Sequence, residues 1–166
     1  MRFFLTAISI LTLITSPASA EGLADILPEK LFNAKGKKVD ASLLEGKYVG
    51  LYFSAHWCPP CRAFTPLLVQ FRNRHLEDNF EVVFVSFDDS NTEKQNYIRN
   101  AGMEWPSIKG ADSKTAKKLA QRFQVEGFPS LIVLDPTGKI VSLDGRSDVM
   151  LSPETALETW KGAESS

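Results

Sequence analysis

Long apolar runs alternate along the chain with segments in which apolar residues recur at helical spacing. The runs at 48–53 and 80–87 are rich in β-branched and aromatic residues, which is typical of buried strands. From Ala63 to about His75, apolar residues recur every three or four positions, so we expect an amphipathic helix that contains Pro66. Strands that alternate with helices in this way predict an α/β fold.

Capping and turn residues predict the remaining elements. Ser90 and Glu93 are spaced as a capping box, which marks the start of a helix. We interpret Asp88 and Asp89 as loop residues that lead into this helix rather than as an acid or metal-binding pair. The other expected elements are a hairpin at the sheet edge with its turn at 33–36, a helical turn at 41–44, an amphipathic helix at 113–123, a strand headed by Pro129, a hairpin with its turn at 135–138 and a last helix that starts at Ser152.

Residues 1–20 have the pattern of a secretory signal peptide rather than of a folded element. Arg2 supplies the positive end, residues 3–14 are mainly apolar, and Ala18-Ser-Ala20 is a small-residue cleavage site. The apolar run is shorter than the roughly 20 residues that a membrane-spanning helix needs. We therefore expect cleavage after Ala20 and no stable membrane association of the mature chain. The alternative is an uncleaved N-terminal anchor.

The chain after residue 20 has the size and charge of one globular domain. Without Arg2, 18 of the 19 Lys and Arg residues remain against 20 Asp and Glu, so residues 21–166 have a net charge of −2. A chain of this length buries roughly 70% of its unfolded surface and needs no metal or disulfide to hold a core. The near-neutral charge argues against nucleic acid or an anionic membrane as a partner, because both require a basic surface. We expect a monomer.

The chain has two cysteines, Cys58 and Cys61, which lie where the first buried strand runs into the following helix. Pro59 and Pro60 fit the first helical turn, where a missing N–H costs no intrahelical hydrogen bond. Cys58 then falls near the helix N-cap, where the partial positive charge of the helix dipole favours a thiolate over a thiol. A Cys-x-x-Cys motif at such a junction indicates dithiol–disulfide redox chemistry.

Two neighbouring side chains are candidates for lowering the thiol pKa of Cys58 further. Arg62 directly follows the second cysteine, and His56 lies two positions before the first. A positive charge close to a thiolate stabilises it relative to the thiol. The resulting exchange chemistry uses sulfur atoms alone, so we expect no metal and no organic cofactor.

Other uses of the two cysteines fit the sequence less well. A structural disulfide across two residues closes a very small loop and contributes little stability. A metal-binding module, for instance for copper, is the main alternative, but His56 and His75 are the two histidines of the chain and neither has finger-like spacing. A c-type haem site requires a histidine directly after the second cysteine, where this chain has Arg62.

Three motifs taken together resemble the thioredoxin superfamily. They are Trp57-Cys-Pro-Pro-Cys61 after an apolar strand, Pro66 eight residues beyond the first cysteine, and Gly127-Phe-Pro129 before a strand. Within the superfamily, segment 52–66 looks most like the tryparedoxin and nucleoredoxin branch. The resemblance covers residues 31–162 and implies a thioredoxin-like fold, with a central mixed β-sheet flanked by helices on both faces.

The resemblance also implies roles for the matching residues. Cys58 is expected to attack a disulfide, and Cys61 to resolve the mixed disulfide that forms. Pro129 is expected to be a cis-proline that faces the cysteines and aligns the substrate backbone. The substrate is expected to lie against the residues around these three, namely Trp57, Phe128, Pro59 and Pro60.

One position departs from the family pattern. Thioredoxins keep a buried aspartate six residues before the first cysteine, where this chain has Tyr52, so a carboxylate relay to the resolving thiol is not supported. The implied partners are disulfide-containing protein substrates and a thiol electron donor. The signal pattern indicates an exported protein, with the bacterial periplasm as the expected compartment and secretion as the alternative.

Overall fold

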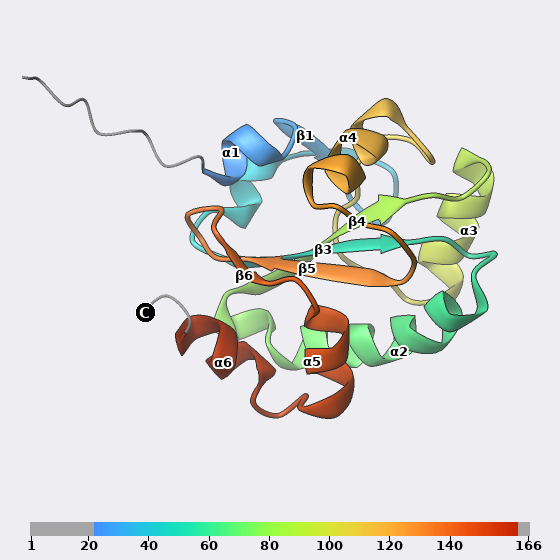
Figure 1. Ribbon diagram of the computed structural model, residues 1–166. Helices are drawn as coiled ribbons and strands as arrows, with labels where there is room; N and C mark the ends of the chain where they lie inside the picture. The colour runs from blue at the N-terminus through green and yellow to red at the C-terminus, as the bar shows by residue number, and fades with distance from the viewer. Residues whose placement is uncertain (1–21, 163–166) are drawn as a thin grey trace, which may run out of the picture.

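Strand β3 (Tyr48–Ser54) is the centre of the fold, and all of its residues are buried. The computed structural model describes residues 22–162 and places β3 between β4 (Phe80–Ser86) and β5 (Ser130–Leu134) in a four-stranded sheet. It pairs in parallel with β4 and antiparallel with β5, and β5 pairs with β6 (Ile140–Ser142) on its other side. The order β4-β3-β5-β6 gives a mixed sheet and confirms the predicted apolar strands (Figure 1).

Helices cover both faces of this sheet, as its continuous apolar strands require. Successive β3 side chains enter opposite core clusters: Tyr48 and Tyr52 join one, and Val49, Leu51 and Phe53 join the other. The first cluster contains residues of α2 (Pro59–Arg74), α3 (Asn91–Asn100), α5 (Gly145–Leu151) and α6 (Ala156–Gly162). The second contains residues of α1 (Leu23–Ile26) and α4 (Lys114–Arg122). In Figure 1, α2, α5 and α6 lie below the sheet and α1 and α4 above it.

Helix α2 follows the predicted course and is anchored to the sheet by packing and by charge. Phe64, Leu68 and Phe71 form its buried face, and Pro66 lies within it. The Arg72 guanidinium donates two hydrogen bonds, of 2.8 and 2.7 Å, to the Glu81 carboxylate on β4. Both side chains are almost fully buried, so each charge depends on the other for compensation. This pair fixes the far end of the helix against β4.

The C-terminal region differs from the prediction of one helix that starts at Ser152. The structure has two short helices, and α6 begins at Ala156, after a turn in which the Ala156 N–H donates to the Ser152 carbonyl. The unpredicted helix α5 begins at Gly145 and lies directly on β5. A Cβ atom at Gly145 would lie 2.7 Å from Val133 Cγ2, which is closer than side chains pack. The absence of a side chain at this position permits the contact.

The N-terminal hairpin is formed by β1 (Lys30–Phe32) and β2 (Lys38–Asp40), followed by the predicted helical turn η1 (Ala41–Leu44). It reaches the sheet edge through Ser107, which bridges to Phe32 of the hairpin and to Phe84 of β4. Another short 3₁₀ turn, η2 (Leu76–Asp78), leads into β4. Helices that are long and apolar enough to cross a bilayer do not occur within residues 22–162. The predicted signal segment lies outside the described residues.

Candidate active site

The N-terminus of α2 holds both cysteines. Cys58 is the N-cap residue, and Pro59 and Pro60 occupy the first two helical positions, as predicted. The Cys61 N–H donates to Cys58 Sγ at 3.3 Å, and the two sulfurs form a disulfide. Cys58 retains 5% exposure whereas Cys61 has none, and both prolines are exposed beside them. Cys58 is therefore the more accessible of the two sulfurs.

The loop before β5 packs against this disulfide. The Phe128–Pro129 peptide bond is cis, which confirms the prediction, and the Phe128 carbonyl oxygen lies 3.7 Å from Cys58 Sγ. A groove of about 430 Å³ runs along this loop. The groove is lined by residues of the loop, of β5 and of the segment that runs from β6 into α5. They are Phe123, Gln124, Val125, Glu126, Gly127, Phe128, Pro129, Ser130, Ile132, Leu143 and Arg146.

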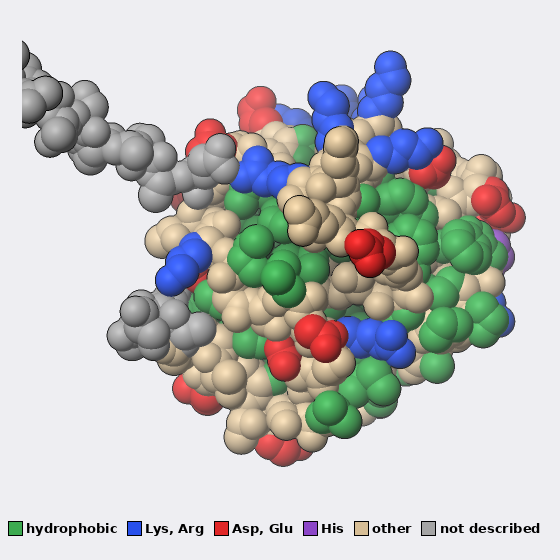
Figure 2. Space-filling model, in the orientation of Figure 1, with side chains coloured by type: hydrophobic (Ala, Val, Ile, Leu, Met, Phe, Trp, Pro, Cys, Tyr) green, Lys and Arg blue, Asp and Glu red, His purple; other side chains and the backbone are tan. Residues whose placement is uncertain are grey.

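Aromatic side chains border the exposed cysteine. Trp57 is 46% exposed, and its ring centroid lies 6.3 Å from that of Phe128. The Trp57 indole N–H donates to the Phe87 carbonyl at 3.0 Å, which fixes the ring across the end of β4. Figure 2 shows hydrophobic side chains gathered on the right of the molecule, where β3 ends and α2 begins in Figure 1. Such a surface suits contact with a polypeptide partner.

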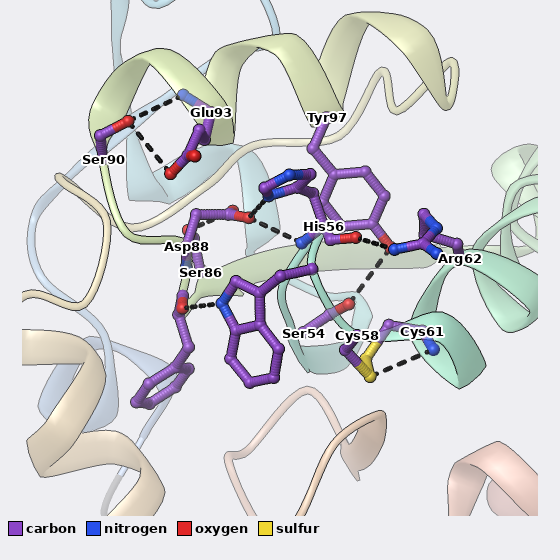
Figure 3. A network of polar contacts seen from close by, with 12 residues as sticks. Ser54, His56, Cys58, Cys61, Arg62, Ser86, Asp88, Ser90, Glu93 and Tyr97 are labelled. Atoms are coloured by element: carbon purple, nitrogen blue, oxygen red, sulfur yellow. Dashed lines mark hydrogen bonds and ion pairs between the residues drawn. A yellow bond between two sulfur atoms is a disulfide. The ribbon is translucent and has the colours of Figure 1, made fainter.

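Arg62 and His56, the two predicted tuning residues, are brought together. Arg62 Nη1 donates to the His56 main-chain carbonyl at 2.6 Å, so the guanidinium is held over the segment that leads into Cys58. The His56 ring is partly exposed and its Nδ1 lies 3.3 Å from Asp88 Oδ1. These contacts are drawn in Figure 3. Both residues are thus anchored next to the segment that leads into Cys58.

This arrangement has counterparts in known proteins. A family model described as thioredoxin-like matches residues 46–140. The tryparedoxin of Trypanosoma brucei brucei is 38% identical over 142 residues, which cover 84% of this chain and 97% of that protein. The chain belongs to the thioredoxin-like family. The predicted resemblance and the thioredoxin-like fold are therefore confirmed.

Within the thioredoxin-like family, the chain is similar to nucleoredoxins and tryparedoxins. Human nucleoredoxin is 35% identical over 146 residues, which are 87% of this chain but 33% of nucleoredoxin, so the chain spans about a third of that relative's length. The crystal structure of native tryparedoxin I from Crithidia fasciculata superimposes with a TM-score of 0.73 at 41% identity and covers 80% of this chain and 93% of the other. Nucleoredoxins and tryparedoxins are thiol–disulfide oxidoreductases.

Behind Cys61, this thioredoxin-like domain has hydroxyl groups in place of the family's buried aspartate. The Thr65 hydroxyl donates to the Cys61 carbonyl at 2.8 Å and accepts from the hydroxyls of Tyr52, at 2.8 Å, and Tyr97, at 2.5 Å. Ser54 Oγ extends the cluster to Tyr97 at 3.3 Å. Burial raises the pKa of Tyr52 above its usual value, so the cluster remains uncharged.

A buried carboxyl group lies on the other side of the site, in the predicted loop that leads into α3. Asp88 has no exposed surface, and it accepts hydrogen bonds from the His56 N–H at 2.6 Å and from Ser86 Oγ at 2.7 Å. The register that pairs Ser54 with Ser86 brings Asp88 beside His56. His56 and Asp88 each follow the end of a buried strand by two residues. If the two strands are parallel neighbours, these residues lie at the same sheet edge, and this is the signal in the sequence that indicates their proximity.

Lys94 on α3 is a buried basic residue whose side chain interacts electrostatically with Asp88. Its ammonium group donates to the carbonyls of Ile108 and Gly110 and lies 6.0 Å from the centroid of the Phe84 ring. Burial lowers the pKa of Lys94 to about 8 from its ordinary 10.5, and Asp88 acts in the opposite direction. Within residues 22–162, no group of three or more His, Cys, Asp or Glu side chains has an arrangement that could hold a metal ion.

The lowered pKa of Lys94 predicts a rise in stability at alkaline pH. Between about pH 8 and pH 10.5 the unfolded chain keeps the Lys94 proton while the folded protein releases it, so the free energy of unfolding increases with pH; below pH 8 both states bind it. In Lys94→Met this contribution should vanish. We expect the difference in free energy of unfolding between the wild type and Lys94→Met to change by about 1–2 kcal/mol between about pH 7.5 and pH 9.5.

Urea unfolding of the disulfide form, whose cysteines do not titrate, measures this difference. Lys118→Met is the matched control, because Lys118 lies on α4 with an exposed side chain. The control should retain the wild-type pH dependence. Parallel pH curves for the wild type and Lys94→Met would show that the burial of Lys94 does not govern its protonation.

Proposed function

We propose that this chain is a thiol–disulfide oxidoreductase that reduces or exchanges disulfides in exported proteins through Cys58 and Cys61. The observation that carries the proposal is the disulfide at the N-terminus of α2, with the more exposed sulfur next to the groove of Pro129. Family membership supports the same chemistry. The groove and the aromatic border supply a surface on which a partner polypeptide can lie.

The proposed reaction has two exchange steps. In the reduced protein, the Cys58 thiolate attacks one sulfur of a partner disulfide, forms a mixed disulfide and expels the other partner sulfur as a thiolate. Cys61 then loses its proton and attacks Cys58 Sγ, which expels the second partner sulfur. Two electrons pass to the partner and the Cys58–Cys61 disulfide remains. A thiol donor reverses these steps on the protein and restores the dithiol.

The first step is assisted by groups that stabilise negative charge on Cys58. The Cys61 N–H is aimed at the sulfur, and the N-terminus of a 16-residue helix adds its partial positive charge. The Arg62 guanidinium, held on the His56 carbonyl, lies on the same segment. Each favours the thiolate over the thiol and so increases the fraction of reactive sulfur.

The thiol donor is proposed to be a protein or a small thiol that enters the same groove. A related protein, tryparedoxin II, has been crystallised in complex with glutathionylspermidine. The groove in this chain is lined by both an acidic and a basic residue, Glu126 and Arg146, and by the apolar Leu143. That lining suits a thiol compound that carries both charged and apolar groups.

Export is part of the proposal and rests on residues 1–20. The positive end, the apolar run and the Ala18-Ser-Ala20 site match a secretory signal. In an oxidising compartment, a dithiol protein can reduce incorrect or obstructive disulfides of other exported proteins. The bacterial periplasm is the proposed location.

The two cysteines should differ in what they trap. With Cys61→Ser, the mixed disulfide on Cys58 cannot be resolved, so covalent complexes with partner proteins should accumulate; Cys58→Ser should form none. Non-reducing gel electrophoresis followed by mass spectrometry measures both. Iodoacetamide should also modify the reduced wild type first at Cys58, which is the more exposed sulfur. Equal trapping by the two variants would contradict the assignment of Cys58 as the attacking cysteine and Cys61 as the resolving cysteine.

The reduction potential should lie on the reducing side of the family. Pro59 and Pro60 have no N–H, so the Cys61 N–H is the main-chain donor that the cap geometry provides to Cys58 Sγ, and the thiolate is only partly stabilised. We expect a potential closer to about −270 mV than to about −120 mV, measured by equilibration with glutathione buffers. Pro60→Ala restores the N–H of the second helical position and should raise the potential. A strongly oxidising wild type would contradict the proposed direction.

Processing of the full chain tests export. Expressed in a bacterium, it should appear in the periplasmic fraction with Glu21 as its first residue, because cleavage follows Ala20. Replacement of both small residues, Ala18→Lys with Ala20→Lys, should leave the unprocessed chain. Mass spectrometry identifies the N-terminus in each case. A wild-type product that keeps Met1 and remains in the cytoplasm would rule out export.

A further inference from the structure

The main-chain segment before Cys58 is held on both sides of a single residue. The His56 N–H donates to Asp88 at 2.6 Å, and the His56 carbonyl accepts from Arg62 at 2.6 Å (Figure 3). The Cys58 N–H donates to the Ala55 carbonyl at 3.3 Å and closes a turn over the same residue. The backbone that delivers Cys58 to the helix N-cap is thus fixed by two side chains from other elements.

Asp88 differs from Arg62 in being completely buried. Its carboxyl group accepts from Ser86 Oγ at 2.7 Å as well as from His56, and its own N–H donates to Ser86 Oγ. A buried carboxyl group is unfavourable unless its hydrogen bonds and charge are compensated. The adjacent Asp89 is exposed, so the two neighbouring aspartates occupy opposite environments.

Capping of helix α3 does not account for Asp88. The cap of α3 is Ser90, whose hydroxyl accepts from the Glu93 N–H at 3.2 Å. Asp88 points away from this cap and toward His56 (Figure 3). The bonds of Asp88 therefore serve the segment that leads to the cysteines.

We propose that Asp88 is a positioning residue for disulfide exchange: by holding the His56 N–H, it fixes the backbone that sets the direction of Cys58 Sγ. Cys58 lies two residues on, and successive Cα atoms are about 3.8 Å apart, so a shift of His56 is transmitted to the sulfur. Exchange requires the attacking sulfur in line with the partner disulfide, and small misplacements reduce rates strongly. The inference rests on the exchange activity proposed above.

Three variants separate geometry from charge. Asp88→Ala removes the acceptor of the His56 N–H and should slow reduction of insulin by the pre-reduced protein by about 10- to 100-fold. Asp88→Asn retains an acceptor oxygen without the charge and should restore the rate to within about threefold of the wild type. Asp89→Ala is the matched control, and it should exchange disulfides at the wild-type rate.

Two further measurements exclude a merely structural effect. The pH dependence of Cys58 alkylation should have the same midpoint in the wild type and in Asp88→Asn, because the proposed role is the hydrogen bond and not the charge. In the reduced wild type, the His56 amide should exchange with solvent at least about tenfold more slowly than in an unstructured peptide. The second measurement requires no variant and so does not depend on whether Asp88→Ala folds.

The outcomes are distinct. A slow Asp88→Ala variant that Asp88→Asn restores, or, if Asp88→Ala does not fold, an active Asp88→Asn variant with a protected His56 amide, supports the proposal. A fully active Asp88→Ala variant, an Asp88→Asn variant as slow as Asp88→Ala, a shifted alkylation midpoint or an unprotected His56 amide overturns it. A wild type that exchanges no disulfide overturns the proposed function instead.

Discussion

The chemistry depends on one junction, where the carboxyl end of β3 meets the N-terminus of α2. Because β3 is buried on both faces, its end cannot move without disturbing the core. Cys58 caps the helix that follows, and the sulfur that accepts the Cys61 N–H is the same atom that bonds to Cys61. The helix end and the reactive centre therefore share one acceptor, which satisfies a backbone donor that would otherwise lack an intrahelical partner. The cysteines are held by regular structure on both sides, as a repeated exchange reaction requires.

The elements that could be predicted are those whose signals are local. The apolar runs of β3 and β4, the helical spacing of α2 and the Ser90 cap are each contained in a few neighbouring residues, and the motif around Cys58 identifies the reactive pair. Helix α5 was missed because it is seven residues long and depends on the contact of Gly145 with β5. Asp88 lies in the loop predicted for it, but its burial was not predicted because nothing local separates it from Asp89. Only the parallel register of β3 and β4 shows that the first of the two aspartates faces His56.

Charge is distributed unevenly around the two cysteines. Behind Cys61 lies a cluster of hydroxyl groups. The Thr65 hydroxyl at its centre uses its donor and both acceptor positions, so its hydrogen-bonding capacity is satisfied. The ionisable groups Asp88, His56 and Arg62 lie instead along the segment before Cys58. The family's aspartate position is occupied by Tyr52, which burial keeps protonated. The ionisable side chains of the site thus lie on the Cys58 side of the disulfide, and the hydroxyl cluster lies on the Cys61 side.

The direction of β3 separates the start of the described chain from the reactive sulfur. Cys58 lies beyond the carboxyl end of the strand, whereas Gly22 lines a cavity together with Gly46, just before the amino end. A seven-residue strand is about 23 Å long, so Gly22 and Cys58 lie near opposite ends of β3. The described chain therefore begins at the end of the sheet opposite Cys58. The reactive edge of the sheet lies away from this starting point.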